Sequence, residues 1–285
     1  MATTYNNLYM DIRQTLRRAG IEAATLEARE LMCFASGKTR SQLVQDGQLY
    51  VPPAIEERAK ELVRRHLAGE PVAYLIGEWE FYGLPLDISE SVLIPRPDTE
   101  TLVDHVVAWL RPLPECRVLD LCAGSGCIGL AIASQVPGAR VVLGELDEGA
   151  LRICRQNIRR NSLSGQVVSL KMDALSDPPP RLGDFDCLVC NPPYIPSGDI
   201  AGLDVSVRDY EPHLALDGGT DGQSKSPSRG GAAASAASGG TCCTPGAAWP
   251  SRWASGRPTT CCGSCEARAS VSWRSCRIRR ASPVW

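Results

Sequence analysis

The first 75 residues alternate apolar and polar positions with the period of amphipathic helices. Within residues 4–18, Leu8, Ile12 and Leu16 recur at steps of four, and Gly20 stands where this helix should end. Three further helix starts follow in the same segment. They are Thr25 as the cap of a second helix that runs through Phe34 and ends at Gly37, Ser41 before a short third helix, and Pro53 at the first turn of a fourth. This pattern predicts a small N-terminal helical bundle over residues 1–75.

Residues 76–95 lose the helical period and favour a β-hairpin. Two short runs rich in aromatic and branched side chains, Trp79–Gly83 and Leu84–Ile88, meet at a glycine. A glycine permits the tight reversal that two antiparallel strands need. We therefore expect a hairpin linker between the bundle and the rest of the chain.

From residue 96 onward, apolar strand-like runs alternate with helical stretches. A helix that begins at Asp98 precedes four nearly continuous apolar strands, expected at Arg117–Leu121, Arg140–Glu145, Gln166–Met172 and Asp184–Cys190. Such strands, separated by helices, are typical of a parallel sheet with helices on its faces. The sequence predicts an α/β fold with a doubly wound, Rossmann-like sheet over residues 96–222.

Charge changes after Gly222 and limits the kind of partner. Residues 223–285 carry nine Lys and Arg residues and one acid, Glu266, which leaves 21 bases and 31 acids upstream. A body with this acidic excess is poorly suited to phosphate backbones, whose binding depends on Lys and Arg, so we expect no direct nucleic-acid binding. Neither a signal sequence nor a run of about 20 apolar residues is present, so we expect no membrane insertion and a cytoplasmic location.

Seven of the 13 cysteines lie before residue 223, several of them within strand-like runs, which favours reduced, buried thiols over disulfides. Cys187 and Cys190 form a C-x-x-C pair, but alternation along a strand places them on opposite faces, which disfavours a shared metal ion. The three histidines, His66, His105 and His213, have no carboxylate or cysteine partners at metal spacing. We predict no metal site.

A strand, a glycine-rich turn and a helix start follow one another at residues 118–129. Gly124 and Gly126 let the backbone approach a ligand closely, although such a turn can also be a plain tight connection. Glu145 follows Gly126 by 19 residues at the end of the next strand, where an acid can bond ribose hydroxyls. Nicotinamide dinucleotides and S-adenosylmethionine both fit such a site.

Asn191-Pro192-Pro193-Tyr194 follows the fourth strand, at the end of the sheet where open α/β folds bind ligands. An amide nitrogen is a poor nucleophile because its lone pair is delocalised. The Asn191 side-chain oxygen and the Pro192 carbonyl can accept both N–H bonds of a planar amide and favour the positive charge that grows on it. Tyr194 can wall or stack on a planar group. A plain turn is the alternative, but this position favours methyl transfer from S-adenosylmethionine.

N-P-P-Y after a D-L-x-x-G-x-G turn resembles the amino methyltransferases that use S-adenosylmethionine. Leu93–Glu100, with the sequence L-I-P-R-P-D-T-E, is similar to the signature of the release-factor glutamine methyltransferases, which also share the bundle and hairpin. The resemblance extends to about Gly222. It implies methylation of the side-chain amide N5 of the glutamine in the Gly-Gly-Gln loop of class-1 peptide chain release factors. We also expect the chain to be a monomer and its bundle to recognise the release factor.

The resemblance also implies the site residues. For the cofactor these are Asp120 near the methionine amino group, Cys122, Ala123, Gly124, Ser125 and Gly126 around the methionine part, Glu145 at the ribose, Asp173 and Ala174 at the adenine, and Asn191. The residues for the substrate glutamine and for catalysis are Asn191, Pro192, Pro193 and Tyr194. Cys122 and Glu145 depart from the family's usual glycine and aspartate. Asp120 can instead cap the following turn, and Arg96 can contact a ligand or pair with Glu100.

Residues 223–285 differ in composition from everything before them. They lack Leu, Phe, Tyr, Asp, Asn, His and Met but hold four of the six tryptophans. Disordered segments are poor in Trp and Cys, whereas out-of-frame translation of a GC-rich gene explains both. A zinc module is disfavoured because Cys242-Cys243 and Cys261-Cys262 are adjacent pairs. We predict a frameshifted, disordered tail, an incomplete methyltransferase domain over residues 96–222, and low activity of this chain.

Two rival functions use the same residues. DNA or RNA amino methyltransferases can share N-P-P-Y, but we would expect them to carry a basic face or a recognition domain, and the acidic body argues against both. A non-catalytic protein that binds the cofactor or a release factor without turnover is the rival from another class. A methyl-transfer assay beside a cofactor titration separates this binder from the enzyme.

Overall fold

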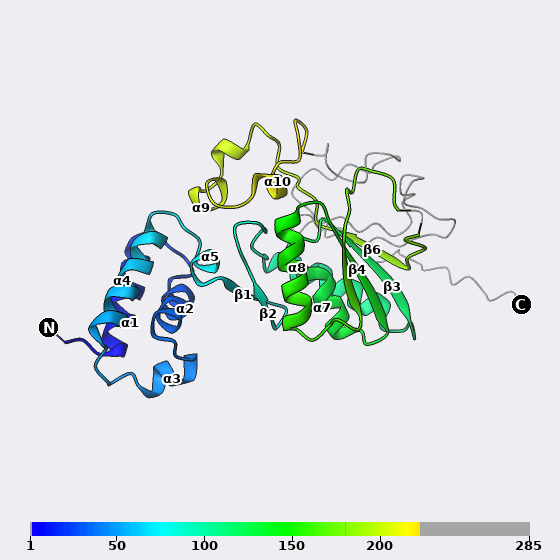
Figure 1. Cartoon of the computed structure of the whole chain (residues 1–285). Coiled ribbons are helices and arrows are strands. Elements are labelled where there is room, and N and C mark those ends of the chain that lie inside the picture. Colours follow the sequence, from blue (N-terminus) through cyan, green and yellow to red (C-terminus); the bar gives the residue numbers. More distant parts are fainter. Residues whose placement is uncertain (1, 180, 223–285) are drawn as a thin grey trace, which may run out of the picture.

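The computed structural model describes residues 2–179 and 181–222 of the chain. Its N-terminal helices pack around a core of their own (Figure 1). They are α1 (Tyr5–Arg18), α2 (Ala24–Ser36), α3 (Arg40–Gln45), α4 (Pro53–Leu67) and α5 (Val72–Ile76). Leu8, Ile12 and Leu16 are buried in that core, which confirms the predicted apolar stripe. The predictions of a frameshifted tail concern residues that lie outside the described part of the chain.

Two helix starts in the bundle differ from the prediction. Ala23 caps α2 without a side-chain hydrogen bond, so the predicted cap at Thr25 is wrong. The Thr25 hydroxyl instead accepts a hydrogen bond from Arg17 at 3.3 Å. Helix α3 begins at Arg40, before the predicted Ser41, because Thr39 and Gln42 form a reciprocal capping box there.

The predicted hairpin joins the bundle to the sheet. Strands β1 (Glu78–Phe81) and β2 (Leu84–Asp87) pair antiparallel. Tyr82 and Gly83 both have positive φ, 52° and 74°, as the tight turn of a two-residue hairpin requires. Trp79 packs against both the bundle core and the sheet core, so the hairpin links them physically.

The remainder builds a parallel α/β sheet (Figure 1). Its elements are α6 (Asp98–Leu110), β3 (Cys116–Leu121), α7 (Cys127–Gln135), β4 (Ala139–Glu145), α8 (Glu148–Arg160), β5 (Val167–Lys171) and β6 (Cys187–Cys190). The strand order is β5-β4-β3-β6 and every neighbouring pair is parallel, which confirms the predicted fold class. Among the described residues, no helix is long and apolar enough to cross a bilayer.

The chain after β6 returns to the bundle through three short helices, η1 (Ile200–Gly202), α9 (Val205–Arg208) and α10 (His213–Leu216). Figure 1 shows α9 near the end of the bundle and α10 above the upper end of α8 in this view. Gly69, just after α4, has φ of 108°, and a Cβ there would lie 2.7 Å from the Val205 Cγ1. The end of the bundle and α9 are therefore in close contact.

One histidine of the bundle should make stability depend on pH. His66 places Nε2 3.0 Å from the Glu27 carboxylate and Nδ1 2.9 Å from the Glu70 carbonyl. Burial lowers the pKa of His66, but these two hydrogen bonds raise it overall above its usual 6.5. Both contacts need a donor on the ring, so only the protonated form satisfies both.

The stabilising contribution of His66 should be fully present below pH about 6.5 and lost as pH rises through the higher folded-state pKa. We expect His66→Gln to remove about 1–3 kcal/mol of stability at pH 5.5 and less at pH 8.5, measured by urea unfolding. His105→Gln, an exposed position on α6, is the matched control. An equal loss at both pH values for His66→Gln would contradict this assignment.

Candidate active site

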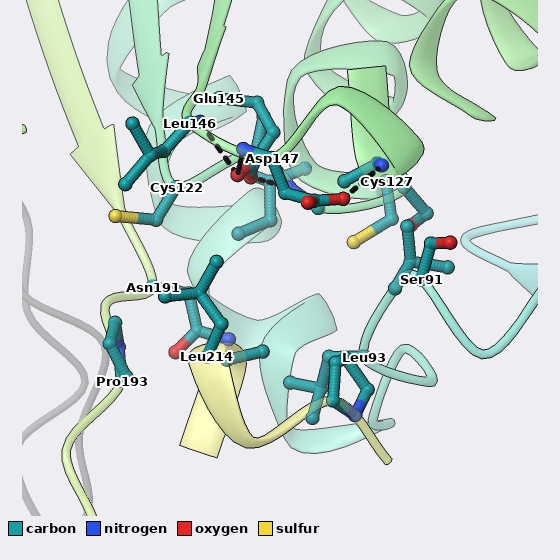
Figure 2. Close-up of a pocket in the computed structure, with 18 of the residues that line it drawn as sticks. Ser91, Leu93, Cys122, Cys127, Glu145, Leu146, Asp147, Asn191, Pro193 and Leu214 are labelled. Carbon is teal, nitrogen blue, oxygen red and sulfur yellow. Dashed lines mark hydrogen bonds between the residues drawn. The ribbon is translucent and has the colours of Figure 1, made fainter. Parts of the chain in front are cut away.

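A cavity of about 360 Å³ lies at the carboxyl ends of the parallel strands and is called the main cavity below. Its walls come from the segments that follow β3, β4, β5 and β6, together with residues 90–99 and 212–215. In Figure 2, Glu145, Leu146 and Asp147 border it on one side and Asn191 and Leu214 on the other. This volume is within the range of small-molecule sites.

The glycine-rich turn after β3 forms one wall. Cys122, Gly124 and Gly126 have φ of 55°, 55° and 81°, so three residues of this turn are left-handed. A Cβ on Gly124 would meet no atom of the described residues within 4 Å, so the backbone there borders open space in this part of the chain. A Cβ on Gly126 would lie 2.9 Å from the Leu143 side chain. Cys122 thus adopts a conformation that favours glycine, and the turn forms despite this departure.

Glu145 ends β4 and its carboxylate binds the backbone of the same wall. Oε2 accepts the Gly124 N–H at 2.8 Å, and Oε1 accepts the N–H groups of Leu146 and Asp147 at 2.7 and 3.0 Å. A carboxylate oxygen has about two acceptor sites. Counting the described residues, Oε1 is therefore filled, whereas Oε2 accepts one hydrogen bond and can accept a second from a ligand.

Asp120 lies behind the glycine-rich turn, outside the lining of the main cavity. It is fully buried, its Oδ2 accepts the Gly129 N–H at 2.9 Å, and its Oδ1 has no hydrogen bond within the described residues. Burial raises the pKa of Asp120 to about 7; the Gly129 N–H opposes this rise and the Glu145 charge adds to it. This geometry fits a carboxylate that accepts a backbone N–H near the start of α7, which was the capping role left open by the sequence.

Asn191 follows β6 directly and lines the main cavity together with Pro193 (Figure 2). Within the described residues its side-chain amide makes no hydrogen bond, so its oxygen can accept one from a ligand. Pro192 is buried and does not line the cavity. Tyr194, 44% exposed, lines a second cavity of about 270 Å³, called the side cavity, which shares Asn191 with the main cavity. Asn191 thus stands at the junction of the two spaces.

Comparison with known proteins assigns this arrangement to one family. Residues 7–77 match the PrmC N-terminal domain and residues 97–204 the methyltransferase small domain. A release factor glutamine methyltransferase of Geobacter sulfurreducens is 41% identical over 213 residues, covering 74% of this chain and 72% of that protein. Its counterpart in Bradyrhizobium diazoefficiens is 39% identical over 210 residues, covering 73% and 70%. The chain belongs to the release factor glutamine methyltransferase family.

Among solved structures, the hMettl16 catalytic domain in complex with an RNA hairpin is 21% identical, with a TM-score of 0.39 over 55% of this chain and 57% of that one. The family assignment rests on the sequence relatives alone. It makes the chain a methyltransferase that uses S-adenosylmethionine, so the Rossmann-like sheet serves this cofactor and the nicotinamide alternative is set aside.

Asp173 and Ala174 follow β5 and line the main cavity. The Asp173 carboxylate already accepts the Leu175 N–H at 2.9 Å and the Ser176 hydroxyl at 2.8 Å. These bonds hold the segment after β5 in place and leave acceptor sites on both oxygens. The predicted adenine role of Asp173 stays a prediction.

The structure of this methyltransferase adds residues to the site that sequence reasoning missed. Leu214 and Ala215, from α10, line the main cavity. Asn157, fully buried on α8, donates to the Ser125 carbonyl at 2.9 Å and exchanges two hydrogen bonds with the Asp87 backbone. It therefore connects the hairpin to the glycine-rich turn. An asparagine at a position of an amphipathic helix that faces the core was the sequence signal that could have identified it.

Arg96 pairs with Glu211, so the pairing with Glu100 that the sequence had allowed is wrong. Glu100 lies on the first turn of α6 and accepts the Tyr82 N–H at 2.8 Å, which bonds the hairpin turn to α6. Arg96 lines the main and the side cavity. The ion pair thus connects the segment before α6 with the segment after β6.

Proposed function

We propose that this chain transfers the methyl group of S-adenosylmethionine to the side-chain amide N5 of the glutamine in the Gly-Gly-Gln motif of class-1 peptide chain release factors. The observation that carries the proposal is the Asn191 amide, which makes no hydrogen bond to any described residue and lies at the junction of the main and side cavities, across from Glu145. Asn191 can there meet both the methyl donor and its acceptor.

The main cavity suits the cofactor in volume and in its polar groups. The turn from Cys122 to Gly126 would hold the methionine part, where Gly124 borders open space. Oε2 of Glu145 would accept a ribose hydroxyl, and Asp173 with Ala174 would hold the adenine. When bound, the cofactor supplies both the activated methyl group and its leaving group.

The residues of the N-P-P-Y segment would orient the acceptor. The Asn191 Oδ1 would accept one N–H bond of the glutamine amide, fix the nitrogen in line and favour the positive charge that develops on it. The predicted second acceptor, the Pro192 carbonyl, belongs to a buried residue that lines neither cavity, so it would have to turn toward the amide when the substrate binds. Pro193 and Tyr194 would wall the amide. The product can lose its proton to water, so no dedicated base is required.

The family assignment supports a release factor as the protein substrate. We propose that the N-terminal bundle recognises it, that Asp120 acts through the glycine-rich turn near the methionine amino group, and that the enzyme works as a cytoplasmic monomer. The acidic body supports a protein substrate over a nucleic acid.

The proposal is tested with the full chain, labelled S-adenosylmethionine and a purified class-1 release factor. The expected result is one methyl group on the glutamine of Gly-Gly-Gln, located by mass spectrometry, and none on a Gln→Glu variant of that release factor. Methylation of DNA or RNA in its place would overturn the proposal. Cofactor binding without transfer would support the non-catalytic alternative.

A further inference from the structure

The main cavity is lined by an unbalanced set of charges. Among the described residues that line it, four carry carboxylates and one, Arg96, carries a permanent cation. The acids are Glu90, Glu145, Asp147 and Asp173. S-Adenosylmethionine has two positive groups, the sulfonium and the α-ammonium, and one carboxylate. The acids favour the positive groups, whereas the carboxylate is repelled wherever it faces them.

Arg96 is fixed in the wall that the two cavities share. Its side chain is 43% exposed, while that of its partner Glu211 is 1% exposed. A guanidinium has five N–H donors, and Glu211 is its one side-chain partner within the described residues. The ion pair therefore orients Arg96 and leaves donors that can reach a ligand.

We propose that Arg96 binds the carboxylate of the cofactor's methionine part and that Glu211 positions it. This inference rests on the function proposed above. A planar guanidinium matches a carboxylate with two parallel N–H bonds. It would hold the methionine end of the cofactor near Asn191, where the acceptor enters, and leave the ribose end to Glu145.

Contact between Arg96 and the reacting amide is the less favourable assignment. A cation at the oxygen of the glutamine amide would draw the nitrogen lone pair further into the carbonyl. The nitrogen would then be a weaker nucleophile, which opposes the reaction. The methyl-donor side is therefore the better place for this charge.

The test compares two ligands that differ in one group. S-Adenosylmethionine and its decarboxylated analogue are titrated calorimetrically into the full chain, into Arg96→Gln and into Arg155→Gln. Arg155 is exposed on α8 and outside the cavity, so its variant controls for the loss of one positive charge. We expect Arg96→Gln to weaken S-adenosylmethionine binding about 10–100-fold and binding of the analogue less than about threefold. Arg155→Gln should change neither affinity by more than about twofold.

Arg96→Lys keeps the charge but not the planar fork, so it should retain part of the selectivity for the carboxylate. This variant carries the test if Arg96→Gln does not fold. Equal weakening of both ligands would show a structural role only, and unchanged binding would place the carboxylate elsewhere; either result overturns the inference. If the unaltered chain bound neither ligand, the proposed function itself would fail.

Discussion

Replacing Asn191 with alanine should lower the rate of methyl transfer by roughly 10²–10³-fold, because one pre-positioned group that stabilises developing charge is worth this much. The amide makes no hydrogen bond within the described residues, so its removal costs little folding stability. Cofactor affinity should fall by no more than about tenfold, since the turn, Glu145 and Asp173 remain. Single-turnover transfer and a cofactor titration measure the two quantities separately.

Two further variants sharpen this prediction. Asn191→Asp keeps an acceptor oxygen at the same place and should lose less activity than the alanine variant. Asn161 stands at the end of α8 and donates a hydrogen bond to the Pro85 carbonyl. Asn161→Ala removes this bond and should leave the rate within about twofold of that of the unaltered chain. A rate for Asn191→Ala within about fivefold of the unaltered chain would remove Asn191 from the catalytic residues.

Replacing Asp120 with asparagine should make the protein more stable above pH 7. The folded-state pKa of Asp120 is raised by burial from 3.8 to about 7. A raised pKa stabilises the protonated folded form, so this contribution is fully present below pH about 4 and is lost as pH rises to about 7. A shift of about three units corresponds to at most about 4 kcal/mol.

The asparagine variant removes this loss but buries an amide N–H₂ at the place where Oδ1 has no partner among the described residues, so we expect a net gain of about 2 kcal/mol at pH 8. At pH 4 it should be no more stable than the unaltered chain. Urea unfolding at both pH values measures this, with the exposed Asp199→Asn as control. Parallel stability curves for the variant and the unaltered chain would show that Asp120 ionises normally.

The sequence predicted the parts of this protein that local patterns determine. Continuous apolar runs between helical stretches were sufficient to predict the parallel sheet. In any such sheet, the carboxyl ends of the strands bring Cys122, Glu145 and Asn191 to the same side. The motif at 191–194 gained its meaning from that position. The exact residue that caps a helix was harder to predict. Thr25 is a good capping residue, yet it lies inside α2, and its hydroxyl accepts a hydrogen bond from Arg17.

Contacts between distant segments could not be predicted. Arg96 and Glu211 are separated by 115 positions, and their pairing depends on the path of the chain after β6. The same path brings Leu214 to the main cavity. Two backbone hydrogen bonds of Glu145 come from the turn that follows it and the third comes from the glycine-rich turn after β3, so they depend on the geometry of both turns and not on residue type. The location of the site residues in the fold could therefore be predicted from the sequence, whereas their hydrogen-bond and ion-pair partners could not.

The contact between Gly69 and Val205 has a consequence for experiments on separate domains. The end of the bundle supports α9, and three residues after α9 Glu211 holds Arg96 at the cavity wall. Deleting residues 1–75 would therefore remove the contact that supports α9, and with it support for the cavity wall, together with the expected recognition surface. Weak methylation by such a fragment would therefore have two causes: Arg96 would no longer be held in position, and the release factor would be bound less tightly.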